Sequence, residues 1–301
     1  MRLCLFVFVI LSFSISSFAQ SSYTPHRVYD TKHKRFTDFE AMAAELAKAD
    51  VVFFGEQHDD SATHRLEIAL LEGIARRRPN VIVALEMFER DTQKLMDDYL
   101  ANKITEAEFL KDSRPWKNYQ ADYKPLIEFA KTKGWKVVAG NVPRRYATVV
   151  FKAGLEAVEK LPSTERKLIA EKFNCPTDDY FKRFKETMSD HPGDNSPKMD
   201  EAMIGKMYQA QCVKDETMAE SIAAAAQASP QALVIHYNGA FHSDFQLGTA
   251  SRAKQRLAKS NVKVVSALPV ENLDTVNPDN DKKRGDYLIF TLKLAAEART
   301  K

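Results

Sequence analysis

The stretch Val51-Val52-Phe53-Phe54-Gly55-Glu56-Gln57-His58-Asp59-Asp60 decides the fold and contains the first candidate site residues. Its four leading apolar residues, two of them β-branched, predict a short buried strand. Glu56 and His58 follow at once, and Asp60 or Ser61 can cap the helix that the next residues predict. We therefore expect Glu56 and His58 in a strand-to-helix turn, at the sheet edge where open α/β proteins bind ligands.

Three later apolar runs, residues 81–85, 136–140 and 232–238, also end in polar side chains. If these runs and the first one are parallel neighbours in a sheet, their polar ends converge at one edge. The converging residues would be Glu56, His58, Glu86, Asn141 and His242.

The alternation of strands and helices predicts an α/β fold with a mainly parallel sheet and flanking helices. This alternation stops between residues 143 and 229, where the pattern is helix after helix. We expect this segment to be a helical insertion that precedes the last site strand. A further strand over residues 286–292 is expected at a sheet edge. The helices of the insertion are predicted over residues 144–161, 164–173, 178–188 and 199–228.

Two capping boxes mark helix starts. Thr37 is followed by Glu40, and Thr105 by Glu108, which is the spacing that satisfies two backbone donors reciprocally. Both helices are expected to begin directly after the threonine.

The first 19 residues have the composition of a secretory signal peptide: Arg2, an apolar run, and small residues before Gln20. The run is short for a membrane span, and Cys4 lies at its start rather than after it, which argues against a lipoprotein. We expect a signal peptide over residues 1–19 and a single domain over residues 20–301. The location would be periplasmic or extracellular, with membrane association left open. Cleavage after Ala19 is the expected outcome, to be checked by mass spectrometry of the mature N-terminus; an intact Met1 would contradict it.

The net charge limits the classes of binding partner, and the cysteines allow one disulfide. The 44 basic residues fall to 43 without Arg2, against 41 acidic residues, so the mature chain is near +2. This balance does not suggest a nucleic-acid partner. Cys175 and Cys212 remain after cleavage, and the sequence leaves open whether they form a disulfide or stay as buried thiols.

The converging residues allow two kinds of chemistry. Glu56, His58, Glu86 and His242 could ligate Zn²⁺ or Mn²⁺ and activate a water. Alternatively, Glu56 and His58 could act directly as base and acid. Caps and ordinary hydrogen-bonded histidines would explain any one residue, but four at successive strand ends favour a site. The residues expected to line the pocket are Asn141, Arg144, His236 and Tyr123, although Tyr123 belongs to an aromatic group that could equally pack on the core.

Five motifs occur in the order seen in the ChaN family, the haem-binding uptake branch of the Tiki superfamily. They are Gly55-Glu56-Gln57-His58, Leu85-Glu86-Met87-Phe88, Asn141-Val142-Pro143-Arg144, Asp215-Glu216-Thr217-Met218-Ala219 and Gly239-Ala240-Phe241-His242. The chain resembles this family from about residue 51 to residue 268. The resemblance implies an α/β fold with a helical insertion and a link to haem or iron acquisition. The wider superfamily includes metal-dependent proteases and erythromycin-esterase-like hydrolases, which share the Gly-Glu-x-His and Gly-x-x-His motifs.

Two functions follow as hypotheses: binding of haem or another small molecule, and metal-dependent hydrolysis of the protease or esterase type. Haem needs an apolar cleft and an axial ligand. The candidate ligands are Tyr180, Tyr208 and His191, all in the insertion. Haem is therefore expected on the insertion, in a pocket apart from the strand-end site. The sequence leaves open whether the protein forms a homodimer.

Overall fold

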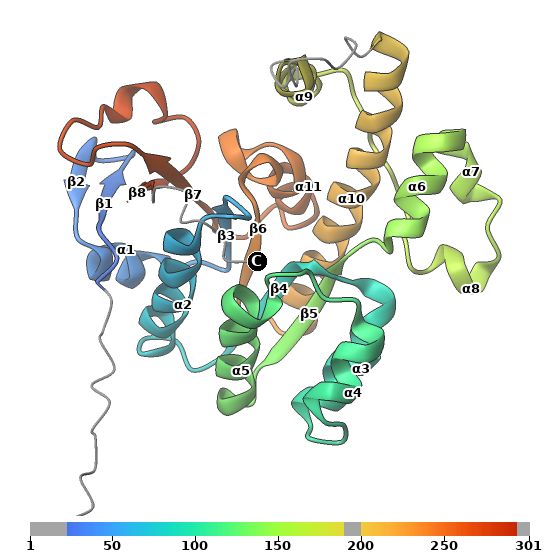
Figure 1. Cartoon of the computed structure of the whole chain (residues 1–301), viewed down its shortest axis with the longest axis horizontal. Coiled ribbons are helices and arrows are strands. Elements are labelled where there is room, and N and C mark those ends of the chain that lie inside the picture. The colour runs from blue at the N-terminus through green and yellow to red at the C-terminus, as the bar shows by residue number, and fades with distance from the viewer. Residues whose placement is uncertain (1–22, 190–199, 294–301) are drawn as a thin grey trace, which may run out of the picture.

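The computed structural model describes residues 23–189 and 200–293, and within them an eight-stranded sheet forms the centre of the molecule (Figure 1). The strands are β1 (His26–Asp30), β2 (Arg35–Thr37), β3 (Val51–Glu56), β4 (Val81–Glu89), β5 (Lys136–Asn141), β6 (Leu233–Gly239), β7 (Val262–Val270) and β8 (Tyr287–Leu292). Their order is β2-β1-β8-β7-β3-β6-β4-β5, and all neighbours are parallel except β1, which is antiparallel to β2 and β8. The four site strands are therefore adjacent and parallel, as predicted.

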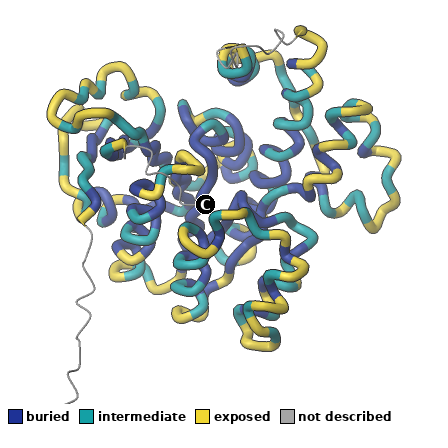
Figure 2. Tube along the Cα trace, viewed as in Figure 1, coloured by how far each residue is buried: buried dark blue, intermediate teal, exposed yellow. Residues whose placement is uncertain are grey.

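The central strands are apolar along their whole length because helices cover both faces of the sheet. Val52 and Phe54 of β3 point to the side covered by α1 (Phe39–Leu46), α2 (Ser61–Ala75) and α5 (Lys124–Lys133). Val51 and Phe53 point to the opposite side, against α10 (Glu201–Ala228) and α11 (Gly248–Arg256). The central strands appear in the buried colour in Figure 2, with exposed residues concentrated on outer helices, loops and the edge strand β2. The predicted fold class is confirmed.

The remaining helices are α3 (Gln93–Leu100) and α4 (Glu106–Ser113), which pack beside α5, and the helices of the insertion between β5 and β6. The insertion contains α6 (Arg144–Ala153), α7 (Glu156–Glu159), α8 (Ser163–Arg166), α9 (Asp179–Ser189) and α10. The helix predicted over residues 144–161 is interrupted because Gly154 has a φ of +82°, a left-handed conformation that an α-helix does not contain. The helix predicted over residues 164–173 is reduced to the short α8.

Two further predictions need correction. Thr37 is not the cap of α1: the side chain of Asp38 accepts the hydrogen bond from Ala41 N, so the helix begins one residue later than the capping box implied. The strand predicted over residues 286–292 is β8. It is not an edge strand, because β1, from the N-terminal part of the chain, pairs with it on the side away from β7. By contrast, Asp60 caps α2 and Thr105 and Glu108 form the predicted capping box of α4.

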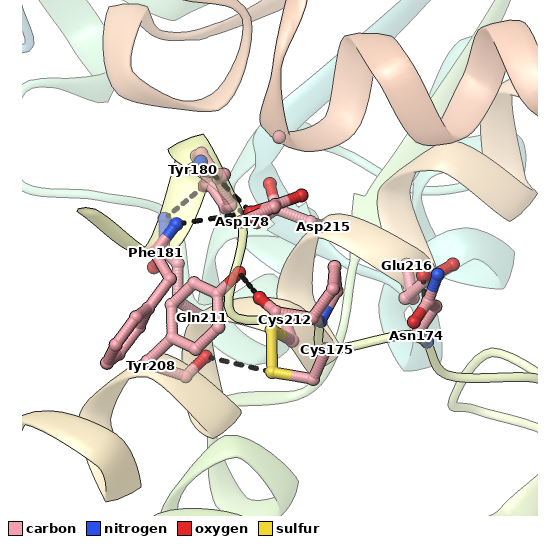
Figure 3. Close-up of a disulfide and its surroundings, with 12 residues drawn as sticks. Asn174, Cys175, Asp178, Tyr180, Phe181, Tyr208, Gln211, Cys212, Asp215 and Glu216 are labelled. Carbon is pink, nitrogen blue, oxygen red and sulfur yellow. Dashed lines mark hydrogen bonds between the residues drawn. A yellow bond between two sulfur atoms is a disulfide. The ribbon is translucent and has the colours of Figure 1, made fainter. Parts of the chain in front are cut away.

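A disulfide joins Cys175, in the segment before α9, to Cys212 on α10 (Figure 3). Tyr208 reinforces this connection by donating a hydrogen bond to the carbonyl of Pro176 at 2.8 Å. The segment that leads into α9 is thus fixed to α10, and α9 lies close to the carboxyl end of the sheet. None of the described helices is both long enough and apolar enough to cross a membrane.

Candidate functional site

A cavity of about 570 Å³ lies at the carboxyl ends of the site strands. One wall is polar and comes from the strand ends. The opposite wall is apolar and comes from the insertion, through Phe151 of α6, Phe184 and Met188 of α9, and Met207 of α10. The polar wall contains His58, Glu86, Asn141 and His242, and Arg144 also lines the cavity. The structure therefore joins in one cavity the two surfaces that the sequence suggested were separate.

Glu56 lies behind the cavity wall and orients His58. Its carboxylate is buried, and Oε1 accepts hydrogen bonds from His58 Nδ1 at 2.6 Å and from the Tyr123 hydroxyl at 2.8 Å. Burial opposes ionisation of Glu56, but the hydrogen bond from His58 and the neighbouring His64 imidazole keep its pKa below the ordinary value. The His58 side chain is 43% exposed, and its ring lies edge-to-face with Trp116.

Gly239, at the end of β6, makes room for this imidazole. A Cβ at position 239 would lie 2.5 Å from His58 Nε2, which is closer than any real contact. The glycine of the Gly239-Ala240-Phe241-His242 motif is thus explained by the close approach of His58 from the neighbouring strand.

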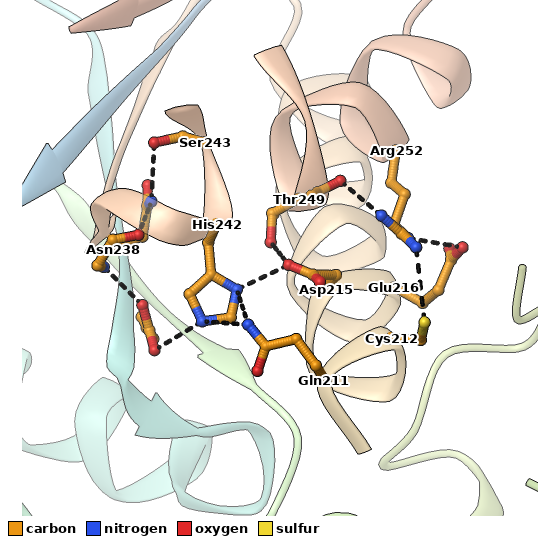
Figure 4. A network of polar contacts seen from close by, with 12 residues as sticks. Gln211, Cys212, Asp215, Glu216, Asn238, His242, Ser243, Thr249 and Arg252 are labelled. Atoms are coloured by element: carbon orange, nitrogen blue, oxygen red, sulfur yellow. Dashed lines mark hydrogen bonds and ion pairs between the residues drawn. The ribbon is translucent and has the colours of Figure 1, made fainter. Parts of the chain in front are cut away.

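His242 is the centre of a second network (Figure 4). Its Nε2 lies 3.2 Å from Glu86 Oε1, and its Nδ1 lies 2.7 Å from Asp215 Oδ1 on α10. Burial lowers the pKa of His242, but the two carboxylates outweigh this effect and raise it to about 10. Burial likewise disfavours ionisation of Glu86, yet the charge of His242 lowers its pKa to about 2. Both ring nitrogens of His242 are therefore engaged by carboxylates.

Asp215 opens one of the five motifs that the chain shares with the ChaN family, but the sequence assigned it no role, and the structure supplies one. Besides His242, it accepts hydrogen bonds from the hydroxyl groups of Thr249 and Tyr180, each at 2.7 Å. Gln211, one helical turn before Asp215, lies 3.3 Å from the His242 ring and lines the cavity. The adjacent carboxylates Asp215 and Glu216, next to the buried apolar residues Val213 and Met218 of α10, are the signal that sequence reasoning could have used.

His64 and Glu67, on the first turns of α2, were not among the candidates. His64 Nδ1 lies 3.1 Å from Glu56 Oε2 and 3.2 Å from Glu67 Oε2. Burial and the charge of Glu56 raise the pKa of Glu67. A histidine and a glutamate three residues apart, on the helix that directly follows the site turn, would have been the sequence signal.

The other expected residues have these positions. Tyr123 binds Glu56 from behind the cavity wall, and His236 is buried between Phe53 and the carbonyl of Ala84, where burial lowers its pKa to about 4. Tyr180 and Tyr208 are buried in the insertion and are not among the described residues that line the cavity. His191 lies outside the described residues.

The four expected metal ligands do not form one compact group. Glu56 pairs with His58, and Glu86 pairs with His242. Among the described residues, the ligand atoms that lie within 4.8 Å of one another belong instead to Glu56, His64 and Glu67.

The network around His242 predicts a dependence of stability on pH. Glu86 stabilises the fold above its ordinary pKa of 4.5, and this contribution is lost as the pH falls towards 2. His242 stabilises the fold below its ordinary pKa of 6.5, and its contribution is lost as the pH rises through 10. We therefore expect the difference in unfolding free energy between wild type and His242→Gln to be largest between about pH 4.5 and 6.5 and to shrink by pH 10. Urea unfolding of both proteins across this range measures it, and a constant difference would contradict the assignment.

The family model of haem-binding uptake, Tiki superfamily, ChaN, matches residues 42–253. Among solved structures, ChaN of Campylobacter jejuni, described with cofacial haem binding, aligns with a TM-score of 0.65 and 20% identity over 89% of this chain and 97% of its own. A mutant of the erythromycin esterase EreC in its open conformation aligns with a TM-score of 0.47 and 10% identity, over 91% and 84%. A Bacillus cereus protein aligns with a TM-score of 0.49 and 10% identity, over 83% and 90%. No curated protein matches the chain.

Proposed function

The chain belongs to the ChaN family, the haem-binding uptake branch of the Tiki superfamily, and from this membership we propose that it binds haem in the cavity at the carboxyl ends of β3, β4 and β6. The observation that supports the proposal is the composition of the cavity: an apolar wall from the insertion faces a polar wall from the strand ends. A porphyrin needs apolar contacts for its ring together with a ligand for its iron.

Two positively charged side chains at the cavity favour an anionic ligand, such as a porphyrin with its propionates. Arg144 and Lys214 both line the cavity. Neither forms an ion pair with an acidic side chain within the described ranges. Their charges are therefore available to a carboxylate of the ligand.

His58 is the iron ligand that we propose. Its Nδ1 is engaged by Glu56, which leaves Nε2 as the nitrogen with a free electron pair. A carboxylate that holds the other ring nitrogen is the usual support of a metal-binding histidine. His242 is the poorer candidate because carboxylates engage both of its nitrogens.

The experiment that tests the proposal is a titration of the purified protein with haem, followed by visible absorbance. We expect a saturable shift of the Soret band at a fixed ratio of haem to protein. A spectrum that stays the sum of free haem and protein would contradict the proposal.

Export by the leader-like residues 1–19 would place this binding in the periplasm or outside the cell, which supports a role in haem or iron acquisition.

A hydrolase is the second candidate, and a specific observation favours it. His58 with Glu56, and His242 with Asp215, are histidine–carboxylate pairs whose two histidines line one cavity. Such pairs can remove a proton from water and return it to a leaving group. Hydrolysis of ester or peptide substrates that is lost in His58→Ala, in protein free of haem, would support this candidate.

A further inference from the structure

A buried polar cluster lies one layer behind the cavity wall and is not explained by haem binding. Glu56, His64 and Glu67 expose 1%, 4% and 0% of their surface. His64 Nδ1 faces two carboxylate oxygens, Glu56 Oε2 at 3.1 Å and Glu67 Oε2 at 3.2 Å. Each of the three side chains offers one ligand atom, and these atoms lie within 4.8 Å of one another.

The hydrogen bond of the other ring nitrogen, His64 Nε2, indicates that Nδ1 carries the free electron pair of the neutral ring. His64 Nε2 lies 3.3 Å from the carbonyl oxygen of His58, to which it can donate a hydrogen bond. In the neutral ring, the single proton is then on Nε2, and Nδ1 presents a free electron pair to the two carboxylates. Three atoms with free electron pairs meet at this point, so protons or a metal cation must lie between them.

One proton does not satisfy the whole cluster. A proton on Nδ1 can be donated to Glu67 Oε2, but Glu56 Oε2 and Glu67 Oε1 are then buried without a hydrogen-bond partner among the described residues. Buried polar atoms in native proteins nearly always have a partner. A divalent cation, by contrast, can take a ligand atom from each side chain and offsets the charge of both carboxylates.

We infer that Glu56, His64 and Glu67 form a binding site for one divalent cation of the Zn²⁺ or Mn²⁺ type. Zn²⁺ accepts carboxylate oxygen together with imidazole nitrogen, and Mn²⁺ also binds such mixed sets. The hydrogen bond from His64 Nε2 to a backbone carbonyl is the support that metal-binding histidines commonly have. This set shares only Glu56 with the four ligands expected from the sequence.

The site would act on the cavity through Glu56. A cation held at Oε2 fixes the carboxylate, while Oε1 remains the acceptor for His58 and Tyr123. Glu56 would thereby connect a buried metal to the imidazole in the cavity, and the metal would position His58 without contact with the ligand there. The inference does not depend on haem, because none of the three proposed ligands is among the residues that line the cavity.

The experiment uses untagged protein, because a polyhistidine tag would bind metal itself. The protein is treated with EDTA and dialysed against Zn²⁺ or Mn²⁺. Elemental analysis is made after excess metal is removed, and thermal unfolding is measured with the metal present in solution. We expect one equivalent of metal per chain. At a metal concentration about a hundredfold above Kd, the melting temperature should rise by roughly 5–10 °C, since the metal binds only the folded state.

Variants identify the ligands. Glu67→Gln keeps the size and one oxygen but removes the charge, and should weaken metal binding by roughly a hundredfold or more. His64→Gln tests the same site if Glu67→Gln does not fold. Glu86→Gln is the matched control: it removes a buried carboxylate of the His242 network and should retain the equivalent of metal.

Two results would overturn the inference. If wild type binds no metal and shows no thermal shift, the cluster is held by a proton alone. If Glu86→Gln loses the metal while Glu67→Gln keeps it, the cation belongs to the strand-end residues. Haem titration of the same proteins is independent of both results, so a failure of the haem proposal would leave the metal measurement intact.

Discussion

Replacing His58 by alanine is expected to abolish the haem-induced shift of the Soret band and to weaken haem binding by about a hundredfold, roughly 3 kcal/mol. His58 is the one histidine of the cavity wall with a ring nitrogen that no described residue engages, and 43% of its side chain is exposed. Its loss removes the proposed axial ligand but little buried structure. Absorbance titration of the variant with haem, beside wild type, measures both effects.

Two controls separate a ligand from a general disturbance of the cavity. Tyr208→Phe removes a hydroxyl that is bound to the carbonyl of Pro176 and should leave the Soret band unchanged. His33→Ala removes an exposed histidine that pairs with Asp30, on another part of the surface, and should also have no effect. If Tyr208→Phe shifts the band and His58→Ala does not, the iron ligand lies in the insertion and the proposed role of His58 is wrong.

The largest loss of stability is expected from Asp215→Ala, about 3–5 kcal/mol in the free energy of unfolding. Asp215 is fully buried and accepts hydrogen bonds from three side chains, those of His242, Thr249 and Tyr180. Its removal leaves these donors without their acceptor and removes one of the two carboxylates that stabilise the His242 cation. Urea unfolding at pH 6 measures the difference, because the charges of the network are fully developed there.

Asp215→Asn and a surface control sharpen this test. The asparagine keeps the shape and one acceptor oxygen, so its cost should lie between those of wild type and alanine. Asp279→Ala removes an exposed partner of Lys282 and should cost less than about 1 kcal/mol. A loss for Asp215→Ala no larger than that for Asp279→Ala would refute the assigned role of Asp215.

Local patterns in the sequence were sufficient to predict the parallel core of the sheet and most residues of the polar cavity wall. The apolar runs at residues 51–54, 81–85, 136–140 and 232–238 are continuous because both faces of the sheet are covered, and each ends in a polar residue at the same edge. These four strands are parallel and adjacent, so the side chains at their ends come together. This is why His58, Glu86, Asn141 and His242 could be grouped before the structure was known.

The rotation and placement of helices could not be derived in the same way. Helical periodicity shows that one face is apolar but not which neighbour it meets, because that depends on packing between segments far apart in the chain. Only the tertiary structure brings Asp215 to His242 and engages the hydroxyl groups of Tyr180 and Tyr208 with Asp215 and the carbonyl of Pro176. It also places α9 opposite the strand ends, with Cys175 joined to Cys212.

The sequence thus determined an α/β fold of the ChaN family and the polar residues at its strand ends, because these follow from period, turn chemistry and motif order along the chain. The tertiary structure decided that polar and apolar walls enclose one cavity, and that His64 and Glu67 support Glu56 from behind. These features depend on how α2, α9 and α10 lie against the sheet. Packing between elements distant in sequence sets that arrangement, and no local pattern records it.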